Sequence, residues 1–372
     1  MKPLRRTYFD VTQDRRPRLM SAIDRRLESI GAVEWPLDFD QMDAAGGKAD
    51  VDAELAAAIN DIWEQRSDVA ARLGLTRQAF DQEMISQGVK DAIQEALVYD
   101  YATMLNFKAF GQKTFYFSEN LVERLANTEL NVAAAMVVPP FRACLFVLDD
   151  DISRNALYAI HGKPAPAPTG EPISVFVTVR PRAGGGRTLS MMIWHADDKR
   201  SRMFVKRELL LADGARVENA LKTDWATILP PDQVWVDEAP FYNDGFRFFR
   251  IVVNGILYLG SSSPDVSGEL RAEDRIPAPA MGMSAKGRRH LEHKKATSTR
   301  LPYIEVGGVV RPLGSPAGQS SKSRVEVRLL VRGHWKSQVH GPGMTLRKLI
   351  HVEPYWRGPE MAELVDRPYL VK

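Results

Sequence analysis

The residues best suited to chemistry are concentrated near the C-terminus, in the stretch VRGHWKSQVHGPGMTLRKLIHVEPYWRG from Val331 to Gly358. It holds three His, two Trp, one Tyr and five Lys or Arg, and Glu353 is its only acid. Lys and Arg neutralise phosphates, while aromatic rings and His stack on unpaired bases. This pattern predicts contact with RNA, through Arg328, Arg332, His334, Trp335, Lys336, Arg347, Lys348, His351, Tyr355, Trp356 and Arg357.

A catalytic interpretation is the alternative. His334, His340 and His351 could serve as acid and base of a metal-free ribonuclease, with neighbouring cations stabilising the charge that develops on phosphorus. The run LDDD at residues 148–151 could instead hold Mg²⁺ in a nuclease, although Asp residues that follow a strand are more often turn formers and helix caps. Composition is the only support for the metal-free ribonuclease.

No resident cofactor or metal is expected. His290 and His293 lie three residues apart, but Glu292 and Glu353 are the only acids near the histidines of this region, and the surrounding Lys and Arg repel a cation. The single Cys144 lies among apolar neighbours and is expected to be a buried thiol with a structural role.

The charge of the chain is divided unevenly. Residues 282–358 contain 15 Lys or Arg and four Glu, a net charge of +11, whereas the whole chain carries +3. The remainder therefore carries −8. A basic C-terminal region on an acidic body is typical of a protein with a polyanionic partner, most often nucleic acid. Mutual attraction of the two regions within the fold is the competing explanation.

Helical periodicity dominates the first third of the chain. Apolar residues recur at helical spacing over Leu19–Ile30 and Val51–Trp63, and a third helix is expected after Thr76, with a stripe that continues to Met104. Gly88 interrupts that stripe and can mark a bend. Ser118 is expected to cap a helix that reaches Leu125.

Strand patterns follow. Runs at 141–148, 173–181, 188–195 and 203–211 are apolar or alternating and are separated by Pro- and Gly-rich breaks. The segment 246–263 is apolar nearly all round, which predicts a buried helix whose polar side carries Arg247, Arg250 and Asn254. Near the C-terminus a strand up to Trp335 and a return strand ending near Pro354 predict a hairpin with one apolar face and one basic face. On this pattern Trp335 is favoured as a core residue, while Trp356 fits the core and the surface equally well.

These patterns predict an α+β protein. Its helical N-terminal third precedes a mainly antiparallel sheet with a buried helix and a C-terminal basic hairpin. The expected divisions are a helical region over 1–130, an α/β core over 131–263, a basic linker over 264–300, and a hairpin region over 301–372 packed on the core. The N-terminus lacks the apolar core of a signal peptide, and no run is continuous enough to span a bilayer, so a cytoplasmic protein without membrane contact is expected.

Three segments together resemble a known family: TFYFSENLVERLANTEL, FRIVVNGILYLGSSS and VRGHWKSQVHGPGMTLRKLIHVEPYWRGP. They are similar to a family of phage and plasmid proteins that includes the second anti-CRISPR inhibitor of the type V-A nuclease. The last segment is the most specific, through its R-G-H-W, G-P-G and E-P-Y-W-R-G elements. The resemblance extends from about residue 80 to the C-terminus.

The resemblance implies a non-enzymatic regulator from a mobile element. Such a protein recognises a nascent polypeptide, either the type V-A CRISPR nuclease or another target, and lowers expression by loss of the translated mRNA. Its partners would be that polypeptide and RNA or the translating ribosome. The family supplies no catalytic residue to carry over, and the ribonuclease stays the alternative.

Overall fold

The computed structural model describes residues 4–72, 74, 76–160, 171–196, 202–226, 240–271, 283–308 and 329–357. The chain divides into two compact units. One unit comprises residues 6–112, and the other comprises residues 1–5 together with 113–372. The expected segments 131–263, 264–300 and 301–372 therefore all fall in the second unit.

The first unit is helical, as its periodicity predicts. Leu19 and Ile23 are completely buried on one face of α2, and the Thr76 side chain caps α5 by accepting from Ala79 N–H at 3.2 Å. The expected single helix after Thr76 is two helices, because Gly88 adopts a left-handed conformation (φ +66°) that ends the first one. The helices are α1 (Tyr8–Arg15), α2 (Pro17–Ile30), α3 (Phe39–Ala44), α4 (Gly47–Arg72), α5 (Arg77–Ser86) and α6 (Val89–Ala109).

A buried carboxylate links three of these helices. Asp100 on α6 is fully buried, accepts the Tyr8 hydroxyl of α1 at 2.7 Å, and pairs with Arg16, which precedes α2, at 3.1 Å. A buried carboxylate needs such partners to offset its lost hydration. The first helix of this unit is thereby fixed to its last helix.

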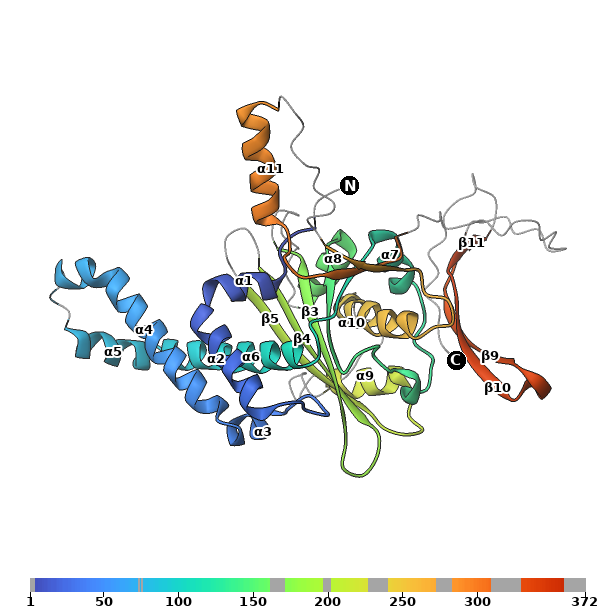
Figure 1. Ribbon diagram of the computed structural model, residues 1–372. Helices are drawn as coiled ribbons and strands as arrows, with labels where there is room; N and C mark the ends of the chain where they lie inside the picture. The colour runs from blue at the N-terminus through green and yellow to red at the C-terminus, as the bar shows by residue number, and fades with distance from the viewer. Residues whose placement is uncertain are drawn as a thin grey trace. The chain divides into compact units, whose positions relative to one another are not determined.

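A seven-stranded mixed sheet lies at the centre of the second unit, with its strands in the order β5-β4-β3-β2-β1-β7-β6 (Figure 1). The expectation of a mainly antiparallel sheet is confirmed, except that β1 runs parallel to both of its neighbours, β2 and β7. The strands are β1 (Thr114–Phe117), β2 (Ala143–Leu148), β3 (Ile173–Pro181), β4 (Arg187–Ala196), β5 (Arg202–Leu211), β6 (Val266–Leu270) and β7 (Tyr303–Val306).

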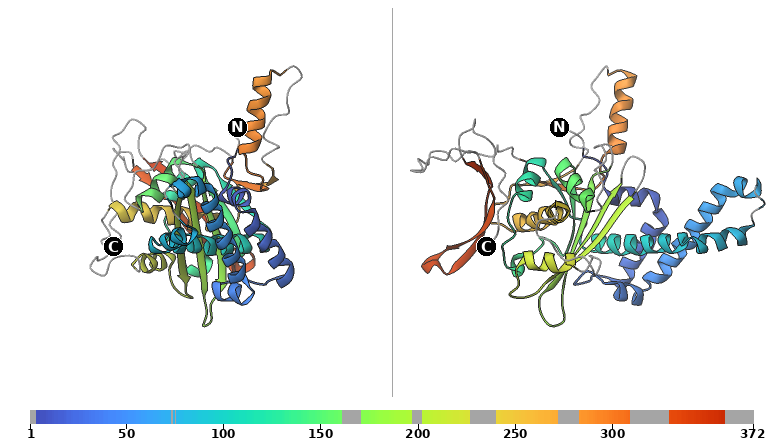
Figure 2. Two further views of the ribbon diagram at one scale, coloured as in Figure 1. Left: turned by 90° about the vertical axis from the view of Figure 1, so that its left-hand side faces the viewer. Right: turned by 180° about the vertical axis from the view of Figure 1, so that it is seen from behind.

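Helices cover one face of this sheet (Figures 1 and 2). Alternate residues of β1 to β5, such as Val175 and Val177 of β3, share one apolar cluster with residues of these helices. The helix at the centre, α10, is lined by buried residues from Phe246 to Tyr258, as its all-round apolar pattern predicts. The covering helices are α7 (Glu119–Ala126), α8 (Asp151–Ala159), α9 (Val217–Ala226) and α10 (Pro240–Leu259).

The burial of Cys144 and the composition of the helices match two further expectations. Cys144 on β2 is buried, as expected, and burial raises the pKa of its thiol. Within the described residues, no helix combines the length and the apolar composition needed to cross a bilayer.

The segment expected as a linker, 264–300, contains regular structure. Strand β6 forms the edge of the sheet, and α11 (Ala285–Thr297) is a helix of 13 residues. Ser284 caps α11 by accepting from Gly287 N–H at 3.2 Å. The sequence GRRHLEHKK (287–295) therefore lies within a regular helix.

Two short antiparallel pairs stand at the C-terminal end of the described chain. The first pairs β8 (Leu329–Val331) with β11 (Tyr355–Arg357), and the second pairs β9 (His334–His340) with β10 (Leu346–Val352). The expected continuous strand is broken at Arg332 and Gly333. A Cβ at Gly333 would lie 2.6 Å from Thr128 Oγ1 and 2.8 Å from Pro354 Cδ, so only glycine allows this close approach.

Candidate functional site

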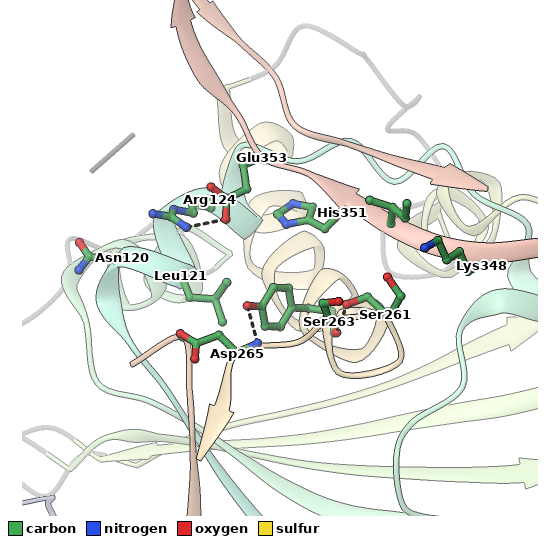
Figure 3. Close-up of a pocket in the computed structure, with 13 residues that line it drawn as sticks. Asn120, Leu121, Arg124, Ser261, Ser263, Asp265, Lys348, His351 and Glu353 are labelled. Carbon is green, nitrogen blue, oxygen red and sulfur yellow. Dashed lines mark hydrogen bonds and ion pairs between the residues drawn. The ribbon is translucent and has the colours of Figure 1, made fainter. Parts of the chain in front are cut away.

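A pocket of about 410 Å³ lies between α7, the C-terminal end of α10 and strand β10 (Figure 3). Its lining is mainly polar and carries charges of both signs. Neutral hydrogen-bonding groups complete the lining. The side chains that define its character are those of Asn120, Arg124, Tyr258, Ser261, Ser262, Ser263, Asp265, Lys348, His351 and Glu353.

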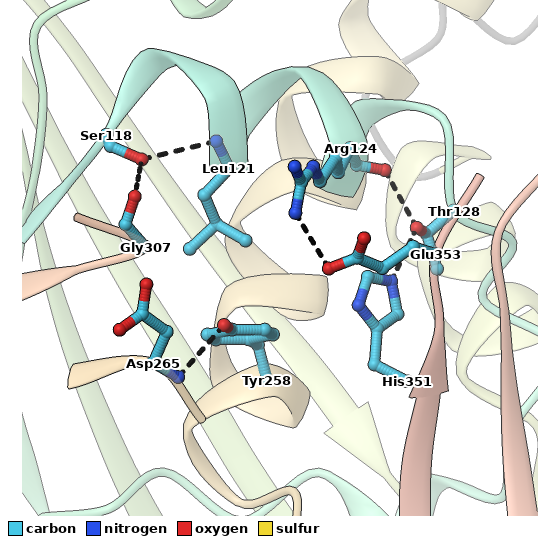
Figure 4. A network of polar contacts seen from close by, with 9 residues as sticks. All are labelled: Ser118, Leu121, Arg124, Thr128, Tyr258, Asp265, Gly307, His351 and Glu353. Carbon is cyan, nitrogen blue, oxygen red and sulfur yellow. Dashed lines mark hydrogen bonds and ion pairs between the residues drawn. The ribbon is translucent and has the colours of Figure 1, made fainter. Parts of the chain in front are cut away.

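Helix α7 supplies the buried cation of the pocket. The Ser118 hydroxyl accepts from Leu121 N–H at 3.3 Å and donates to the Gly307 carbonyl, which fixes the start of the helix beside β7. Arg124 then lies in the last turn with its side chain only 8% exposed. Its Nη1 donates to Glu353 Oε1 at 2.7 Å (Figure 4). This ion pair connects α7 to the segment after β10.

The end of α10 supplies hydroxyl groups. Tyr258 Oη accepts from the backbone N–H of Asp265 at 3.0 Å, and burial raises the pKa of this phenol, which keeps its own proton for donation. The Ser261 hydroxyl donates to the Tyr258 carbonyl at 2.7 Å. Ser262 N–H donates to the Leu349 carbonyl at 3.1 Å, so the serine run is tied to β10.

His351 is held in one neutral form. The Thr128 hydroxyl donates its only hydrogen to the Arg124 carbonyl at 2.7 Å, so at its 3.0 Å contact with His351 Nε2 it must accept. The proton of His351 therefore lies on Nε2, and Nδ1 keeps a lone pair. Burial, and after it the charges of Arg124 and His334, lowers the pKa of His351 to about 4. With this pKa the imidazole is neutral at pH 7, so it can form hydrogen bonds there but does not carry the extra proton that a general acid donates.

Asn254 on α10 anchors the hairpin beside this pocket. Its Nδ2 donates to the carbonyls of Leu125 at 2.8 Å and Thr128 at 2.9 Å, and its Oδ1 accepts from Trp335 Nε1 at 2.8 Å. The Trp335 ring lies against His351 with a centroid separation of 4.7 Å. The interpretation of Trp335 as a core residue is thus confirmed, and its ring packs against the apolar cluster.

The other residues expected to contact RNA have different environments. Arg332, His334, Lys336 and Arg347 are exposed, whereas Lys348, His351 and Tyr355 are half-buried. Arg328 lies outside the described residues, as do the side chains of Trp356 and Arg357. The expected role of this set in binding nucleic acid stays a prediction.

The register of β9 and β10 corrects the expectation of a single basic surface. Lys336 pairs with Ile350, whereas Arg347 pairs with Val339. Because successive side chains of a strand point to opposite faces, His334 and Lys336 lie on one face of the hairpin and Arg347 on the other. The hairpin therefore presents cations on both faces.

The same register separates the three hairpin histidines. His351 pairs with Trp335 on the face that packs on the core, while His334 and His340 belong to the other face and are six residues apart along β9. An acid and a base must both reach one reacting group. These positions remove the geometric basis for the histidine ribonuclease.

The acidic run after β2 has structural partners. Asp149 pairs with Arg154 at 3.3 Å and with Arg5 at 2.9 Å, and Asp151 pairs with Arg154 at 2.6 Å. Asp150 caps α8 by accepting from Ser153 N–H at 2.7 Å and from the Ser153 hydroxyl at 2.8 Å. Across the described residues, no group of three or more His, Cys, Asp or Glu side chains is placed to hold a metal ion.

Asp150 offers a test of this capping role. Burial raises its pKa to about 6, so its charge is poorly solvated. We expect Asp150→Ala to lose about 1 kcal/mol of unfolding free energy at pH 7, because the first turn of α8 loses its acceptor. Asp150→Asn keeps an acceptor oxygen and should cost less. Urea unfolding of both variants measures the difference, and equal losses would argue against capping.

Sequence reasoning missed the pocket because its lining comes from distant parts of the chain. Arg124, Tyr258 and Asp265 belong to no recognisable motif. A signal was nevertheless present. Except for Asp265 and Gly307, every lining residue belongs to one of the three segments that carry the family resemblance: 114–130, 249–263 and 331–359.

Comparison with known proteins gives one match. A protein-family model described as AcrVA2-like, the anti-CRISPR type V subtype A2 family, matches residues 115–359. This range includes the whole pocket, α11 and the hairpin. No curated protein and no solved structure matches the chain.

Proposed function

Because the chain belongs to the anti-CRISPR type V subtype A2 family, we propose that it is a mobile-element regulator that recognises a nascent polypeptide and lowers expression of its target through loss of the translated mRNA. The target is the type V-A CRISPR nuclease or another protein. In this proposal the pocket beside β10 receives the peptide, and the hairpin contacts RNA or the ribosome.

One observation carries the proposal: the three segments that resemble the family converge on one pocket. They contribute Arg124 from α7, Tyr258 and Ser263 from the end of α10, and Lys348 and Glu353 from the hairpin region. An extended peptide offers backbone donors and acceptors along its length, together with charged side chains. Neutral hydroxyls flanked by charges of both signs are complementary to such a ligand.

Electrostatics supports an anionic partner for the hairpin. Arg250 on α10 has its pKa lowered to about 10, first by burial and then by the nearby charge of Arg332. A phosphate beside Arg332 would relieve that repulsion. Trp335 and His351 are committed to contacts with the core, so phosphate contacts and not stacking on these two rings would supply the affinity. Stacking stays a proposal for Tyr355 and Trp356.

A variant that fills the pocket tests peptide capture. Ser263 is exposed at the rim of the pocket, and Ser263→Trp should occupy the space while leaving the described hydrogen bonds in place. We expect recovery of ribosomes that translate the target to fall roughly tenfold, equivalent to about 1.4 kcal/mol. Ser263→Ala is the matched control and should behave as the parent. Full recovery with the Trp variant would exclude the pocket as the peptide site.

A second variant tests the hairpin. Arg332→Ala/Lys336→Ala should weaken binding to unrelated RNA sequences alike and flatten its salt dependence, because fewer counterions are released. Ser337→Ala/Gln338→Ala changes neutral neighbours on the same strand and should leave both unchanged. RNA affinity across a salt series, measured beside target expression, separates this role from that of the pocket. Unaltered RNA affinity and silencing in the Arg332/Lys336 variant would make the hairpin a purely structural element.

A further inference from the structure

Helix α11 is a strongly basic element that the proposed function leaves unused. It contains five Lys or Arg and two His in 13 residues, and Glu292 is its only acid. Leu291, at 8% exposure, is its only buried side chain. Figure 2 shows α11 standing apart from the helices that cover the sheet. Its Lys, Arg and His side chains are exposed, except that of Lys294, which is half-buried.

The stability of the helix does not explain its charge. Lys294 and Lys295 lie in the last turn, where cations interact favourably with the helix dipole. Lys286 and Arg288 lie in the first turn, where the dipole disfavours them, and Arg289 follows directly after it. Among the described residues, no carboxylate forms an ion pair with any of these five cations. A partner outside the chain would neutralise them.

The cations and histidines form a stripe along the helix. Lys286, Arg289, His290, His293 and Lys294 recur at spacings of three and four residues, which places them on one face. Arg288 and Lys295 lie near the opposite face, on the side of Leu291. The stripe thus contains charges for phosphates and two flat rings that can stack on bases.

The composition of α11 disfavours a membrane surface and duplex DNA as its polyanionic partner. A helix that lies on a membrane surface needs a broad apolar face, and Leu291 alone does not provide one. Readout of base edges in duplex DNA typically uses Asn or Gln beside Arg, and α11 contains neither amide. Phosphate charges combined with unpaired bases are the features of single-stranded nucleic acid.

We propose that α11 binds single-stranded RNA through the stripe formed by Lys286, Arg289, His290, His293 and Lys294. The choice of RNA over DNA rests on the proposed function, in which the target is a translated message. The contact itself depends on neither the hairpin nor the pocket. It gives the protein a second RNA-binding element within the range that defines the family.

Two charge-matched variants of the full chain test this proposal. Arg289→Ala/Lys294→Ala removes two cations from the stripe, and Arg288→Ala/Lys295→Ala removes the same two residue types from the other face. Each variant loses one Arg near the start of the helix and one Lys from its last turn, so the dipole effects are similar. Affinity for a fluorescein-labelled uridine oligomer is measured across a salt series. The same measurement is made with a DNA oligomer of matching length and with vesicles of anionic lipid.

The stripe variant should bind the uridine oligomer roughly tenfold more weakly, and its slope of log affinity against log salt should fall by about 1.4. The other variant should stay close to the parent in both respects. Equal losses in the two variants, or no loss in either, would overturn the proposal, as would tighter binding to DNA or to vesicles than to RNA. The expected loss in the stripe variant would support RNA binding by α11 whatever the other variants show. Intact silencing in the pocket and hairpin variants would contradict the proposed function without affecting this result.

Discussion

Replacement of Asn254 by leucine should release the hairpin and destabilise its unit by roughly 3 kcal/mol. Asn254 is fully buried on α10 and forms three hydrogen bonds, to Leu125, Thr128 and Trp335. The Leu125 carbonyl keeps a second donor, Thr128 N–H at 3.2 Å. The leucine side chain would leave the Thr128 carbonyl and the Trp335 indole N–H without their partner. Urea unfolding measures the loss of stability, and limited proteolysis of β9 reports the release.

Trp335→Phe is the matched control for this prediction. It removes the indole N–H and part of the ring area but keeps an aromatic ring against His351, so it should cost less than Asn254→Leu and leave the hairpin resistant to protease. RNA binding by the exposed cations needs a positioned hairpin, so Asn254→Leu should also weaken it. A hairpin that stays equally resistant in Asn254→Leu would show that Asn254 does not anchor it.

His351 should make the protein less stable as the pH falls. Its pKa is lowered from 6.5 to about 4 in the folded state, chiefly by burial. Above pH 6.5 the imidazole is neutral in both states. As the pH falls from 6.5 to 4, only the unfolded state takes up the proton, so unfolding becomes easier by about 2 kcal/mol at pH 5 and roughly 3 kcal/mol at pH 4.

Asp150 opposes this effect, so a variant is needed to isolate it. Its pKa is raised to about 6, and its protonation favours the folded state as the pH falls from 6 towards 3.8. His351→Gln removes the imidazole titration and leaves that of Asp150. Between pH 7 and pH 5 the unfolding free energy of the parent should therefore fall by about 2 kcal/mol relative to that of the variant. Identical changes in the two proteins would mean that His351 titrates normally in the folded state.

Local patterns determined most of the secondary structure. Alternating apolar residues predicted β2 to β5 because one face of each strand packs on the helices. Ser118 marked the start of α7 because a serine side chain satisfies a free N–H of the first turn. The apolar segment 246–263 predicted a buried helix, and α10 occupies 240–259. These features depend on residues close together in the chain.

Other features depend on contacts that local patterns do not encode. The strand expected to continue through Arg332 is interrupted because Gly333 lies against Thr128, about two hundred residues away in sequence. The parallel pairing of β1 with β2 and β7 likewise depends on which strands become neighbours. The basic composition of α11 concealed its helix, since a solvated helix has no apolar stripe to reveal it.

The candidate site shows the same division most clearly. The sequence by itself determined that the C-terminal region is basic and rich in rings, that it resembles an anti-CRISPR family, and that Trp335 suits the core. Only the tertiary structure placed His351 and Trp335 in contact with the body, divided the cations between two faces of the hairpin, and brought Arg124, Tyr258 and Glu353 to one pocket. The physical reason is that composition fixes the charge and apolar area of a segment, while packing between distant segments decides which side chains lose contact with water.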